Sequence, residues 1–425
     1  MQFIKYPARE SWEELLKRPT KSLEEIERKV APVLQDVKNR GDAALMEYAE
    51  KWDGVKLASV VVSEDEMLRA AKDVSDELRR AIDTAKRNIE LFHVAQKQVA
   101  EVVETMPGVQ CWRKSVAIEK VGLYIPGGTA PLFSTVLMLA VPAQIAGCRE
   151  IVLCSPPDKN GNIHPAILYT AHLCGVTKIY KTGGAQAIAA MAYGTESVPQ
   201  VSKIFGPGNQ YVTAAKQLVN KEGIAIDMPA GPSELLVMGD DESRPDFIAA
   251  DLLSQAEHGI DSQVLFVTTE EAYLNLVHFA IDQQLQNLPR REIIQQTLVN
   301  SKLIVVKDIE EAIELSNYYA PEHLILQTRN AELLAEKVVN AGSVFLGHYT
   351  PESAGDYASG TNHTLPTNGH ARAYSGVSLD SFVKKITFQQ ITKEGLQQLG
   401  ETIEVMAANE QLDAHKNAVT IRLRS

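Results

Sequence analysis

The sequence predicts an α/β protein with two doubly wound parallel-sheet domains, a helical N-terminal segment and a small C-terminal tail. Two observations lead to this prediction. From about residue 117 onward, short β-rich runs alternate with helical stretches, first in one series and then in a second. Such alternation implies parallel strands joined by right-handed crossovers. In addition, 425 residues are too many for one ordinary hydrophobic core.

The N-terminal part of the chain, up to about position 110, is predicted to be mostly helical. Ser22 with Glu25 and Ser63 with Glu66 each fit a capping box, in which a side chain and the backbone three residues away bond reciprocally. Between these two boxes, "LASVVVS" is predicted to form a short strand.

Each of the two series supplies its own strands and helices. In the first series the expected strands are "VGLYIP", "EIVLCS", "KIYKT", "SKIFG", "GIAID" and "ELLVMG", with helices over 132–147, 165–174, 185–193 and 209–220. In the second the expected strands are "QVLFVTT", "KLIVVK", "HLILQT" and "SVFLG", with helices over 245–258, 270–286, 309–318 and 330–340. The two series share no sequence similarity, although their architecture is alike.

The stretch 347–376 has no clear periodicity, and it contains Asp356 and three of the ten histidines. Loops of this length in compact domains are usually functional or disordered. A disordered segment would favour a purely polar, charge-rich composition, so we expect a functional loop. The segment after Gly376 is predicted to form a strand and helices.

Charge and hydropathy bound the possible partners. The net charge of −12 argues against a nucleic-acid partner, because phosphate binding requires a basic face. The first residues, "MQFIKYPARESWEELLKR", lack the apolar segment of a secretory signal. The longest apolar run is interrupted by Pro142 and Gln144 and is too short to span a membrane. We therefore expect a cytoplasmic protein that contacts neither nucleic acid nor membrane.

The four cysteines, Cys111, Cys148, Cys154 and Cys174, form no C-x-x-C pair. A zinc-ribbon or thiol redox motif is therefore not visible. Buried free thiols are the expected state. A catalytic thiol stays open as an alternative, since aldehyde-oxidising enzymes can use one as nucleophile.

A partial dinucleotide-binding pattern occurs in "SKIFGPGNQYVTAAKQLV", where Gly206 and Gly208 lie between a predicted strand and a helix. Backbone N–H groups at such a junction can bind phosphate. The third glycine of the pattern is missing, and Tyr211 stands in its place. Asp227 follows the next strand, near where a ribose-binding acid would fall. Plain turns, here and in "YIPGGTAP" and "KTGGAQA", are an equally good interpretation.

The stretch "APEHLIL" places Glu322 and His323 side by side just before a strand. In extended geometry their side chains would point to opposite faces. Both residue types can transfer protons near neutral pH, and the end of a parallel strand is a common place for a ligand. A surface pair is the alternative, and these two residues alone favour it.

A metal site is a further possibility in "LLSQAEHG". On a helix, Gln255 and His258 share a face with Asp251, while Glu257 points elsewhere. Zn²⁺ accepts nitrogen and oxygen ligands and needs at least three from the protein in a catalytic site. Further ligands could come from Asp356, His363 and His415. An ordinary solvated helical face is the alternative, and Q-x-x-H by itself favours it.

Taken together, these segments resemble the histidinol dehydrogenase family. The motifs, in order, are "GLYIPGG", "GGAQAIAA", "IFGPGNQYV", "AGPSE", "LSQAEHG", "APEHL", "DYASGTNHTLPT" and "EQLDAHKNAV", which cover the chain from about residue 120 to its end. The resemblance implies that each of the two α/β domains has an incomplete Rossmann-like fold. We expect an N-terminal segment (1–20), a metal-carrying domain (21–112 plus 236–376), a dinucleotide-binding domain (113–235) and a tail exchanged between subunits (377–425).

The resemblance also implies the site residues. One Zn²⁺ per subunit would be held by Gln255, His258, Asp356 and His415. The same four residues, with Ser233, His323, His363 and Glu410, would bind the substrate. NAD would contact Tyr124, Gln186 and Asn209, which puts Asp227 in doubt as a cofactor ligand. Glu410 and His415 would come from the other subunit of a homodimer.

The family reaction is the four-electron oxidation of L-histidinol to L-histidine, the end of histidine biosynthesis, with two NAD⁺ reduced in sequence. By this resemblance, neutral His323 takes the proton of the alcohol and Glu322 deprotonates the water that adds to the intermediate aldehyde. His323 then accepts the proton of the hydrate. The Zn²⁺ would hold the imidazole and amino nitrogens of the substrate, as a positioning template more than as a Lewis acid.

Two alternatives remain open. A related NAD-dependent dehydrogenase of another small polyol or sulfonated alcohol would keep the α/β frame and lose some substrate-side residues. A non-catalytic, two-lobed amino-acid binding protein would also share the frame, because a fold alone does not decide a function. Such a protein would not need Glu322 beside His323.

Overall fold

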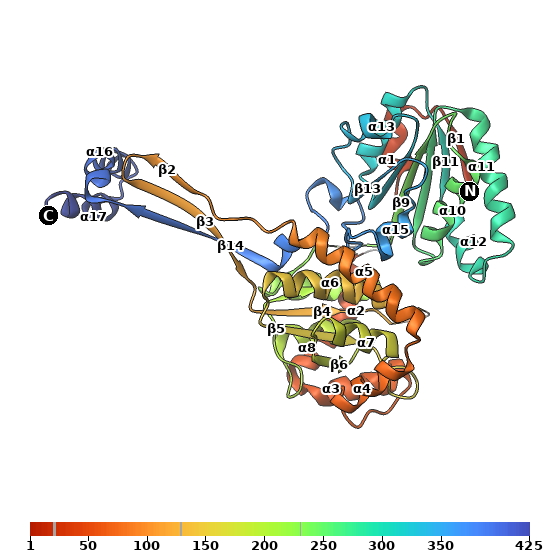
Figure 1. The fold of residues 1–425 in the computed structure, drawn as a ribbon, viewed down its shortest axis with the longest axis horizontal. Helices are drawn as coiled ribbons and strands as arrows, with labels where there is room; N and C mark the ends of the chain where they lie inside the picture. Colours follow the sequence, from red (N-terminus) through yellow and green to blue (C-terminus); the bar gives the residue numbers. More distant parts are fainter. Residues whose placement is uncertain (20–22, 128–129, 230) are drawn as a thin grey trace. The chain divides into compact units, whose positions relative to one another are not determined.

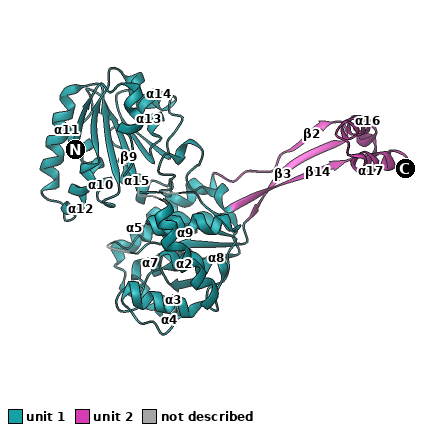
Figure 2. Ribbon diagram, turned by 180° about the vertical axis from the view of Figure 1, so that it is seen from behind, with its two compact units in different colours: residues 1–95, 118–382 teal, residues 96–117, 383–425 magenta. Residues whose placement is uncertain are grey.

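The computed structural model describes residues 1–19, 23–127, 130–229 and 231–425. The chain divides into two compact units (Figure 2). Unit 1 comprises Met1–Ala95 and Ile118–Phe382, and unit 2 comprises Gln96–Ala117 and Val383–Ser425. The capping box predicted at Ser22 lies outside the described residues.

Unit 1 contains a five-stranded, fully parallel sheet in the order β6-β5-β4-β7-β8. Its strands are β4 (Lys120–Tyr124), β5 (Glu150–Ser155), β6 (Lys178–Lys181), β7 (Lys203–Phe205) and β8 (Ala225–Ile226). The connecting helices are α6 (Phe133–Ala146), α7 (Pro165–Leu173), α8 (Gly184–Tyr193) and α9 (Gln210–Lys221). This is the doubly wound alternation predicted for the first series.

The six-stranded sheet of unit 1 is also parallel, in the order β1-β11-β10-β9-β12-β13. Its strands are β1 (Gln2–Lys5), β9 (Glu234–Gly239), β10 (Gln263–Thr268), β11 (Lys302–Val305), β12 (His323–Gln327) and β13 (Ser343–Leu346). Its helices are α1 (Trp12–Leu15), α10 (Pro245–Ala256), α11 (Glu271–Leu285), α12 (Arg291–Val299), α13 (Ile309–Tyr319), α14 (Ala331–Ala335) and α15 (Glu352–Tyr357). Apart from the N-terminal edge strand β1, both sheets have the same strand order, as the similar alternation suggested.

Helices cover both faces of each sheet (Figure 1), because successive side chains of a fully buried strand point to opposite faces. In β4, Val121 and Leu123 belong to one apolar cluster, whereas Tyr124 belongs to the other. In β9, Leu235 and Val237 pack on the side of α10–α12, and the alternate residues pack on the side of α1, α13 and α14. Continuous apolar runs such as "ELLVMG" are thus buried on both sides.

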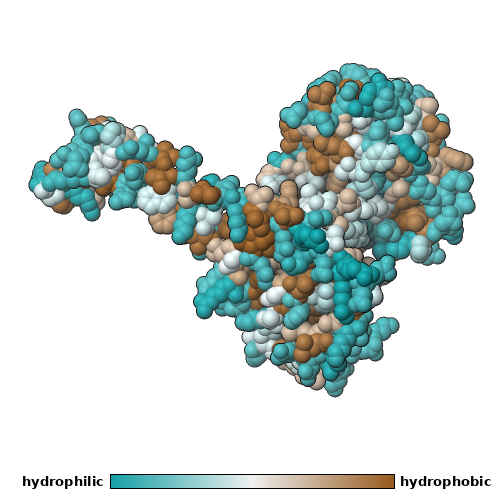
Figure 3. All heavy atoms as spheres, in the orientation of Figure 1, coloured by the Kyte–Doolittle hydropathy of each residue, from teal (hydrophilic) through white to brown (hydrophobic). Residues whose placement is uncertain are grey.

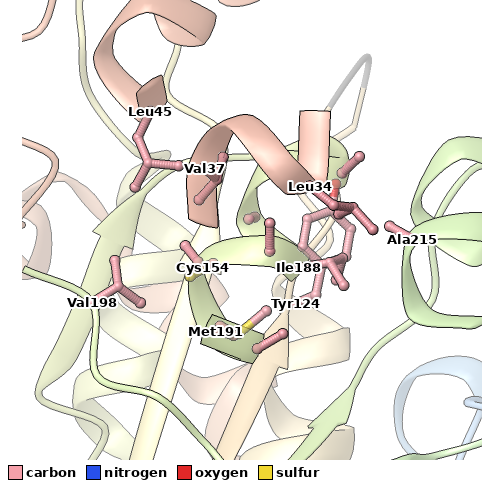
Figure 4. Packing of buried hydrophobic residues seen from close by; sticks show 14 of the residues in the cluster. Leu34, Val37, Leu45, Tyr124, Cys154, Ile188, Met191, Val198 and Ala215 are labelled. Atoms are coloured by element: carbon pink, nitrogen blue, oxygen red, sulfur yellow. The ribbon is translucent and has the colours of Figure 1, made fainter. Parts of the chain in front are cut away.

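The N-terminal helices differ from expectation in the sheet that they cover. Helices α2 (Leu23–Arg40), α3 (Asp42–Tyr48), α4 (Glu64–Asp73) and α5 (Asp76–Val94) pack on the five-stranded sheet and not on the six-stranded one. Helix α5 also contacts loop 347–376, where Asn88 donates to the carbonyl oxygen of Ala358 (2.8 Å). Leu34 and Val37 of α2 contact the cluster that contains Ile188 and Met191 of α8 (Figure 4). Helical periodicity reveals an apolar face but not the surface that it covers. The capping box of Ser63 and Glu66 is confirmed at the start of α4.

Two further differences concern single strands. The expected separate segment 1–20 includes β1, which pairs with β11 as an edge strand of the six-stranded sheet. The run "ELLVMG", expected to close the first series, is β9 at the centre of the six-stranded sheet. Sequence order alone cannot assign a strand at the border of two sheets. Within the described ranges, no helix is both long and apolar enough to cross a membrane.

Unit 2 is a three-stranded antiparallel sheet with two helices (Figure 2). The strands are β2 (Val102–Met106), β3 (Val109–Ala117) and β14 (Val383–Ile391), and the helices are α16 (Lys393–Asn409) and α17 (Asp413–Leu423). The predicted strand and helices of the tail are therefore present. The expectation of a mostly helical N-terminal part missed β2 and the start of β3. Strand β3 pairs with β14, which lies far away in the sequence, and it carries no local sign of this pairing.

Candidate active site

Most of the predicted site residues of unit 1 meet at the amino edge of the six-stranded sheet. Neighbouring strands β9 and β12 begin there, with Glu234 and His323. Helix α10 follows β9, and its C-terminal end returns Gln255 and His258 to this edge. Ligands of open α/β sheets usually bind outside the carboxyl ends of the strands. The residues grouped here lie at the opposite, amino edge. Helix α15, which carries Asp356, follows β13 and also contributes to this group.

Strand alternation suggested that Glu322 and His323 point to opposite faces. The structure shows a different arrangement. The carboxylate of Glu322 accepts a hydrogen bond from the backbone N–H of Glu234 (2.8 Å), and Nδ1 of His323 lies 3.2 Å from the carbonyl oxygen of Glu234. Nδ1 of His323 is also 3.6 Å from Oε2 of Glu322. Because Glu322 precedes the strand, the alternation does not apply to it. Both side chains converge on the main chain of Glu234.

These contacts decide how the His323 ring can act. If Nδ1–H donates to the carbonyl of Glu234, Nε2 of the neutral ring carries the lone pair and can accept a proton. Nε2 is buried and has no hydrogen-bond partner among the described residues. Burial lowers the pKa of His323, but the carboxylates of Glu322, Glu352 and Asp356 outweigh it and raise the pKa well above its usual value. A cation bound by Glu352 and Asp356 would offset their charge and favour the neutral ring that can accept a proton.

A cluster with metal-ligating side chains lies beside His323. One ligand atom from each of His258, Glu352 and Asp356 lies within 4.8 Å of the others. Glu352 and Asp356 are four residues apart on α15, so they share one face of that helix. Glu352 was not among the predicted site residues. Its spacing from Asp356 in "PESAGDY" is the signal that could have identified it.

The residues of this cluster fit a divalent cation. Burial raises the pKa of Glu352 well above its usual value, since neighbouring carboxylates add to the cost of its charge. Burial also raises the pKa of Asp356, but the imidazoles of His323, His363 and His258 outweigh this effect and lower it. A buried group of carboxylates is stabilised by a bound cation. Imidazole nitrogen with carboxylate and amide oxygens is a ligand set that Zn²⁺ accepts.

Gln255 is fully buried next to this cluster. With its amide turned to satisfy both ends, the nitrogen donates to the carboxylate of Glu352 and the oxygen accepts from the backbone N–H of Glu234 (3.1 Å). In the opposite orientation the amide oxygen faces the Glu352 carboxylate, and a cation is needed to hold two such oxygens together. Glu257 caps the end of α10 and is outside the cluster, in agreement with its predicted direction.

Ser233 and His363 lie on either side of this cluster. The hydroxyl of Ser233 is 3.5 Å from Nδ1 of His258. Nδ1 of His363 lies 2.9 Å from the carbonyl oxygen of Asp356, and its Nε2 lies 3.2 Å from the hydroxyl of Thr135 on α6. Burial lowers the pKa of His363. Loop 347–376 therefore brings α15 and His363 to the edge where β9 and β12 begin.

Glu410 and His415 belong to unit 2. Glu410 follows α16, His415 lies in the first turn of α17, and both are exposed.

The three predicted cofactor contacts line one cavity of about 1270 Å³ at the carboxyl edge of the five-stranded sheet. The hydroxyl of Tyr124 accepts a hydrogen bond from the backbone N–H of Gly184 (3.1 Å), and burial raises the pKa of Tyr124 to about 12. Asn209 caps α9 by accepting from the N–H groups of residues 211 and 212. Gln186 is buried, and its Oε1 has no partner among the described residues.

The partial glycine pattern forms a tight turn at Gly206, which the side chain of Asp227 holds in place. Gly206 has φ +129°, and a Cβ there would lie 2.1 Å from the carbonyl oxygen of Tyr124. The buried carboxylate of Asp227 accepts from the N–H groups of Gly206 (2.8 Å) and Met228 (2.7 Å) and pairs with the Lys216 ammonium. Asp227 therefore holds the turn, and the interpretation as a ribose-binding acid is wrong.

All four cysteines are free, as predicted; Cys154 and Cys174 are buried, and Cys111 and Cys148 are half-buried. Burial raises the pKa of Cys148 to about 11 and that of Cys174 to about 12, and it raises the pKa of Cys154 even further. A thiol nucleophile needs the opposite shift. These three thiols are therefore unsuited to covalent catalysis.

The comparisons with known proteins agree with this geometry. Residues 16–423 match the model of the family described as histidinol dehydrogenase. A histidinol dehydrogenase of Bacteroides thetaiotaomicron is 64% identical over 425 residues, which cover 100% of this chain and 99% of the relative. The chain belongs to the histidinol dehydrogenase family. It is therefore an oxidoreductase.

Other histidinol dehydrogenases are similar along the same length. That of Escherichia coli (strain K12) is 54% identical over 419 residues, covering 98% of this chain and 96% of the relative. The crystal structure of histidinol dehydrogenase from Elizabethkingia anophelis matches with a TM-score of 0.97 and 56% identity, covering 100% of this chain and 98% of that one. The whole fold, including both units, is thus typical of the histidinol dehydrogenase family.

Proposed function

We propose that the protein oxidises L-histidinol to L-histidine through L-histidinaldehyde, with two hydride transfers to NAD and one Zn²⁺ per subunit. These are the last steps of histidine biosynthesis. The observation that carries the proposal is the arrangement at His323. Its buried Nε2 has no hydrogen-bond partner among the described residues and lies 3.5 Å from Oδ1 of Asp356 in the metal-ligating cluster. A proton acceptor therefore lies beside a site that can hold the substrate.

His323 acts as the base for the alcohol. The hydroxyl proton of histidinol passes to Nε2 while the hydride on the same carbon leaves, so the C–O single bond becomes a carbonyl. The bond from Nδ1 to the Glu234 carbonyl keeps the ring in one orientation and one tautomer. NAD, when bound, supplies the hydride acceptor in both steps.

Glu322 prepares the second oxidation. An aldehyde has no hydroxyl proton to lose, so water must first add to its carbonyl carbon. Glu322 is held through one carboxylate oxygen by the N–H of Glu234. It takes the proton of this water while protonated His323 returns the alcohol proton to the carbonyl oxygen, which gives the hydrate. His323, neutral again, then takes the hydroxyl proton of the hydrate as the second hydride leaves. The two residues lie 3.6 Å apart, so one substrate position serves both oxidations.

We assign the zinc ligands as Gln255, His258, Asp356 and His415. The side chains of the first three lie in or beside the cluster described above. When bound, the Zn²⁺ would supply a fixed positive charge that holds the substrate through its nitrogen atoms. Glu352 contacts the Gln255 amide and helps to orient it, in the way that residues around a metal site fix its ligands. Ser233, His363 and Glu410 complete the substrate site in this proposal.

We assign the NAD site to the 1270 Å³ cavity of the five-stranded sheet. Tyr124, Gln186 and Asn209 line it at the carboxyl ends of the strands, near the point where the strand order reverses between β4 and β7. Dinucleotides bind doubly wound sheets at this position. The unpaired oxygen of Gln186 offers a hydrogen-bond acceptor to the cofactor.

A homodimer would bring Glu410 and His415 to the site of the other subunit. Unit 2 has few buried side chains of its own and exposes many apolar ones, shown brown in Figure 3. Exposed apolar residues in it include Val99, Val102, Ile386, Phe388, Met406 and Ile421. A unit this small needs another surface to bury its apolar face, and a symmetric partner offers one.

The test of the proposed function is a count of products. Purified protein is incubated with L-histidinol and excess NAD⁺, and NADH is measured per histidinol consumed. Two NADH without free aldehyde are expected, because both oxidations use the same residues. One NADH with aldehyde released into solution would contradict the four-electron reaction. No turnover of histidinol, with reduction of NAD⁺ by another small polyol or sulfonated alcohol, would favour the alternative substrate class.

A further inference from the structure

Arg18 makes a buried, two-pronged contact with Glu234. Its Nε donates to one carboxylate oxygen (2.5 Å) and its Nη2 donates to the other (2.8 Å). Nη2 also donates to the carbonyl oxygen of Tyr319 (2.8 Å), and the guanidinium lies 4.0 Å above the ring of Tyr319. The Arg18 side chain is 14% exposed and that of Glu234 is 3% exposed. The guanidinium therefore has little freedom to move.

The same carboxylate anchors the loop that carries His363. Glu234 accepts a hydrogen bond from the backbone N–H of Asn368 (2.6 Å). The neighbouring Thr367 hydroxyl accepts from the N–H of Gly231, just before β9. One buried side chain thus joins three parts of the chain that are far apart in sequence: the segment before α2, the start of β9 and the end of the loop.

The main chain of Glu234 in turn holds both proposed proton-transfer residues. Its N–H donates to the Glu322 carboxylate, and its carbonyl lies against Nδ1 of His323. Among the described residues, Arg18 forms no hydrogen bond or ion pair with Glu322 or His323. A change at Arg18 can reach the reacting groups through Glu234, and through the carbonyl groups of Tyr319 and Ala320 that precede Glu322. The Glu234 variant isolates the first route.

We propose that Arg18 and Glu234 form a positioning pair, which holds the main chain of residue 234 where it aligns Glu322 and His323 for proton transfer. This inference rests on the proposed function, since it depends on the roles of Glu322 and His323. It adds two residues that act on the reaction without contact with the substrate.

Physical chemistry favours a positioning role over a purely stabilising one. A buried ion pair is weak evidence for stability, because desolvation offsets much of its attraction and apolar residues often do as well. What a bidentate arginine–carboxylate pair adds is fixed geometry. Glu234 is also the one acidic residue in a strand that is otherwise apolar, "ELLVMG". Small misplacements of catalytic groups are costly, with a shift of about 1 Å lowering rates by roughly 100-fold.

The test compares Arg18→Met, Arg18→Lys and Glu234→Gln with the parent enzyme and with Arg40→Met. Arg40 makes a similar bidentate pair with Asp36 on α2, away from both sites, so it controls for the loss of such a pair. For each protein, kcat and KM for histidinol and for histidinaldehyde, zinc content and the melting temperature are measured. We expect kcat of Arg18→Met and Glu234→Gln to fall about 10- to 100-fold for both substrates. KM should change less than about threefold, because neither residue is assigned to bind substrate. The kinetics are measured with saturating Zn²⁺, because the Gln255 amide also accepts from the N–H of Glu234.

Two comparisons separate positioning from folding. Arg18→Lys keeps the positive charge but loses the bidentate hydrogen bonding of the guanidinium. Its kcat should therefore lie between those of the parent enzyme and Arg18→Met. In folded Arg18→Ala, added methylguanidinium should restore part of kcat. Full kcat in folded Arg18→Met, or a loss equal to that of Arg40→Met, would overturn the inference. If Arg18→Met does not fold, full kcat in Arg18→Lys would overturn it.

A failure of the positioning pair can be distinguished from a failure of the proposed function. If the parent enzyme does not oxidise histidinol, or if Glu322→Gln is fully active, the assigned roles are wrong. If the parent is active and Glu322→Gln is slow while the Arg18 variants are normal, only the positioning pair is wrong.

Discussion

Nε2 of His323 lies 3.5 Å from Oδ1 of Asp356, although the two residues come from different elements of the six-stranded lobe. His323 begins β12, and Asp356 lies on α15, beyond the next strand. This contact joins the proposed proton acceptor to the metal-ligating cluster. The proposed base and the proposed metal ligands therefore lie in one site.

Metal binding should depend steeply on His258. We expect a chelator to abolish activity and Zn²⁺ to restore it. His258→Ala should fold normally but bind Zn²⁺ at least about 100-fold more weakly, since changes outside the ligand set alone cost 10- to 100-fold. Glu257→Ala is the matched control, because Glu257 is next to His258 in the sequence but its carboxylate is not in the cluster. Titration with a competing chelator measures the zinc affinity of both variants. Full activity of His258→Ala in metal-free buffer would refute the site.

Glu322→Gln should slow the conversion of aldehyde to acid more than that of alcohol to aldehyde. Glutamine keeps an oxygen for the N–H of Glu234 but cannot take a proton from water. Loss of a general base typically costs about 100- to 10,000-fold. Single-turnover measurements with histidinol and with histidinaldehyde separate the two halves. Equal slowing of both would mean that Glu322 has a structural role, or that the roles of the two bases are assigned wrongly.

Subunit mixing should reveal a site shared between protomers. If His415 comes from the partner, a heterodimer of Gln255→Ala and His415→Ala has one intact and one doubly damaged site. Random exchange of these two inactive variants should then restore about a quarter of the parent activity. Gln255→Ala mixed with His258→Ala is the control and should restore none, because both ligands come from one chain. No recovery in the first mixture after thorough exchange would place the whole site in one chain.

Gly206→Ala should weaken NAD binding and destabilise the five-stranded lobe. The new methyl group would lie 2.1 Å from the carbonyl oxygen of Tyr124, at a φ of +129° that other residues avoid. Such strain costs about 1–3 kcal/mol. Gly223→Ala is the control, with φ +98° but nothing within 4 Å of its Cβ. Melting temperature and KM for NAD⁺ should both worsen for Gly206→Ala, whereas the control should lose stability alone. An unchanged KM for NAD⁺ in Gly206→Ala would argue against a cofactor at this turn.

Asp53→Asn should stabilise the NAD-free protein in a pH-dependent way. Asp53 lines the proposed NAD cavity, and burial raises its pKa to about 6. Below pH of about 4 the carboxyl is protonated in both the folded and the unfolded states, so its ionisation costs the folded state nothing. As pH rises towards 6 the unfolded state loses its proton first, and stability falls.

The gain from Asp53→Asn should therefore be absent near pH 4 and complete above about pH 6. Because Asp53 is only partly buried, we expect a gain on the order of 1 kcal/mol. Denaturant unfolding at pH 4 and pH 8 measures it. A gain of equal size at both pH values would mean that the charge of Asp53 is not its source.

The sequence by itself determined the local elements and the family. The alternation of strands and helices predicted two doubly wound sheets, since apolar runs of strand length are buried on both faces in such sheets. The capping box of Ser63 and Glu66 was readable because all of its partners lie within one helical turn. The shared helical face predicted for Gln255 and His258 is different, because α10 ends at Ala256 and His258 lies beyond it.

Only the tertiary structure decided which surfaces and side chains meet. Nothing local shows that α2 covers the five-stranded sheet, that β3 pairs with β14, or that Arg18 reaches Glu234 from a distant part of the sequence. The convergence of Glu322 and His323 on the main chain of Glu234 likewise depends on β9 and β12 being neighbours. Periodicity and propensity act over short stretches of chain, whereas these contacts arise from the packing of whole elements. The chemistry of the site therefore depends on contacts that no short stretch of sequence encodes.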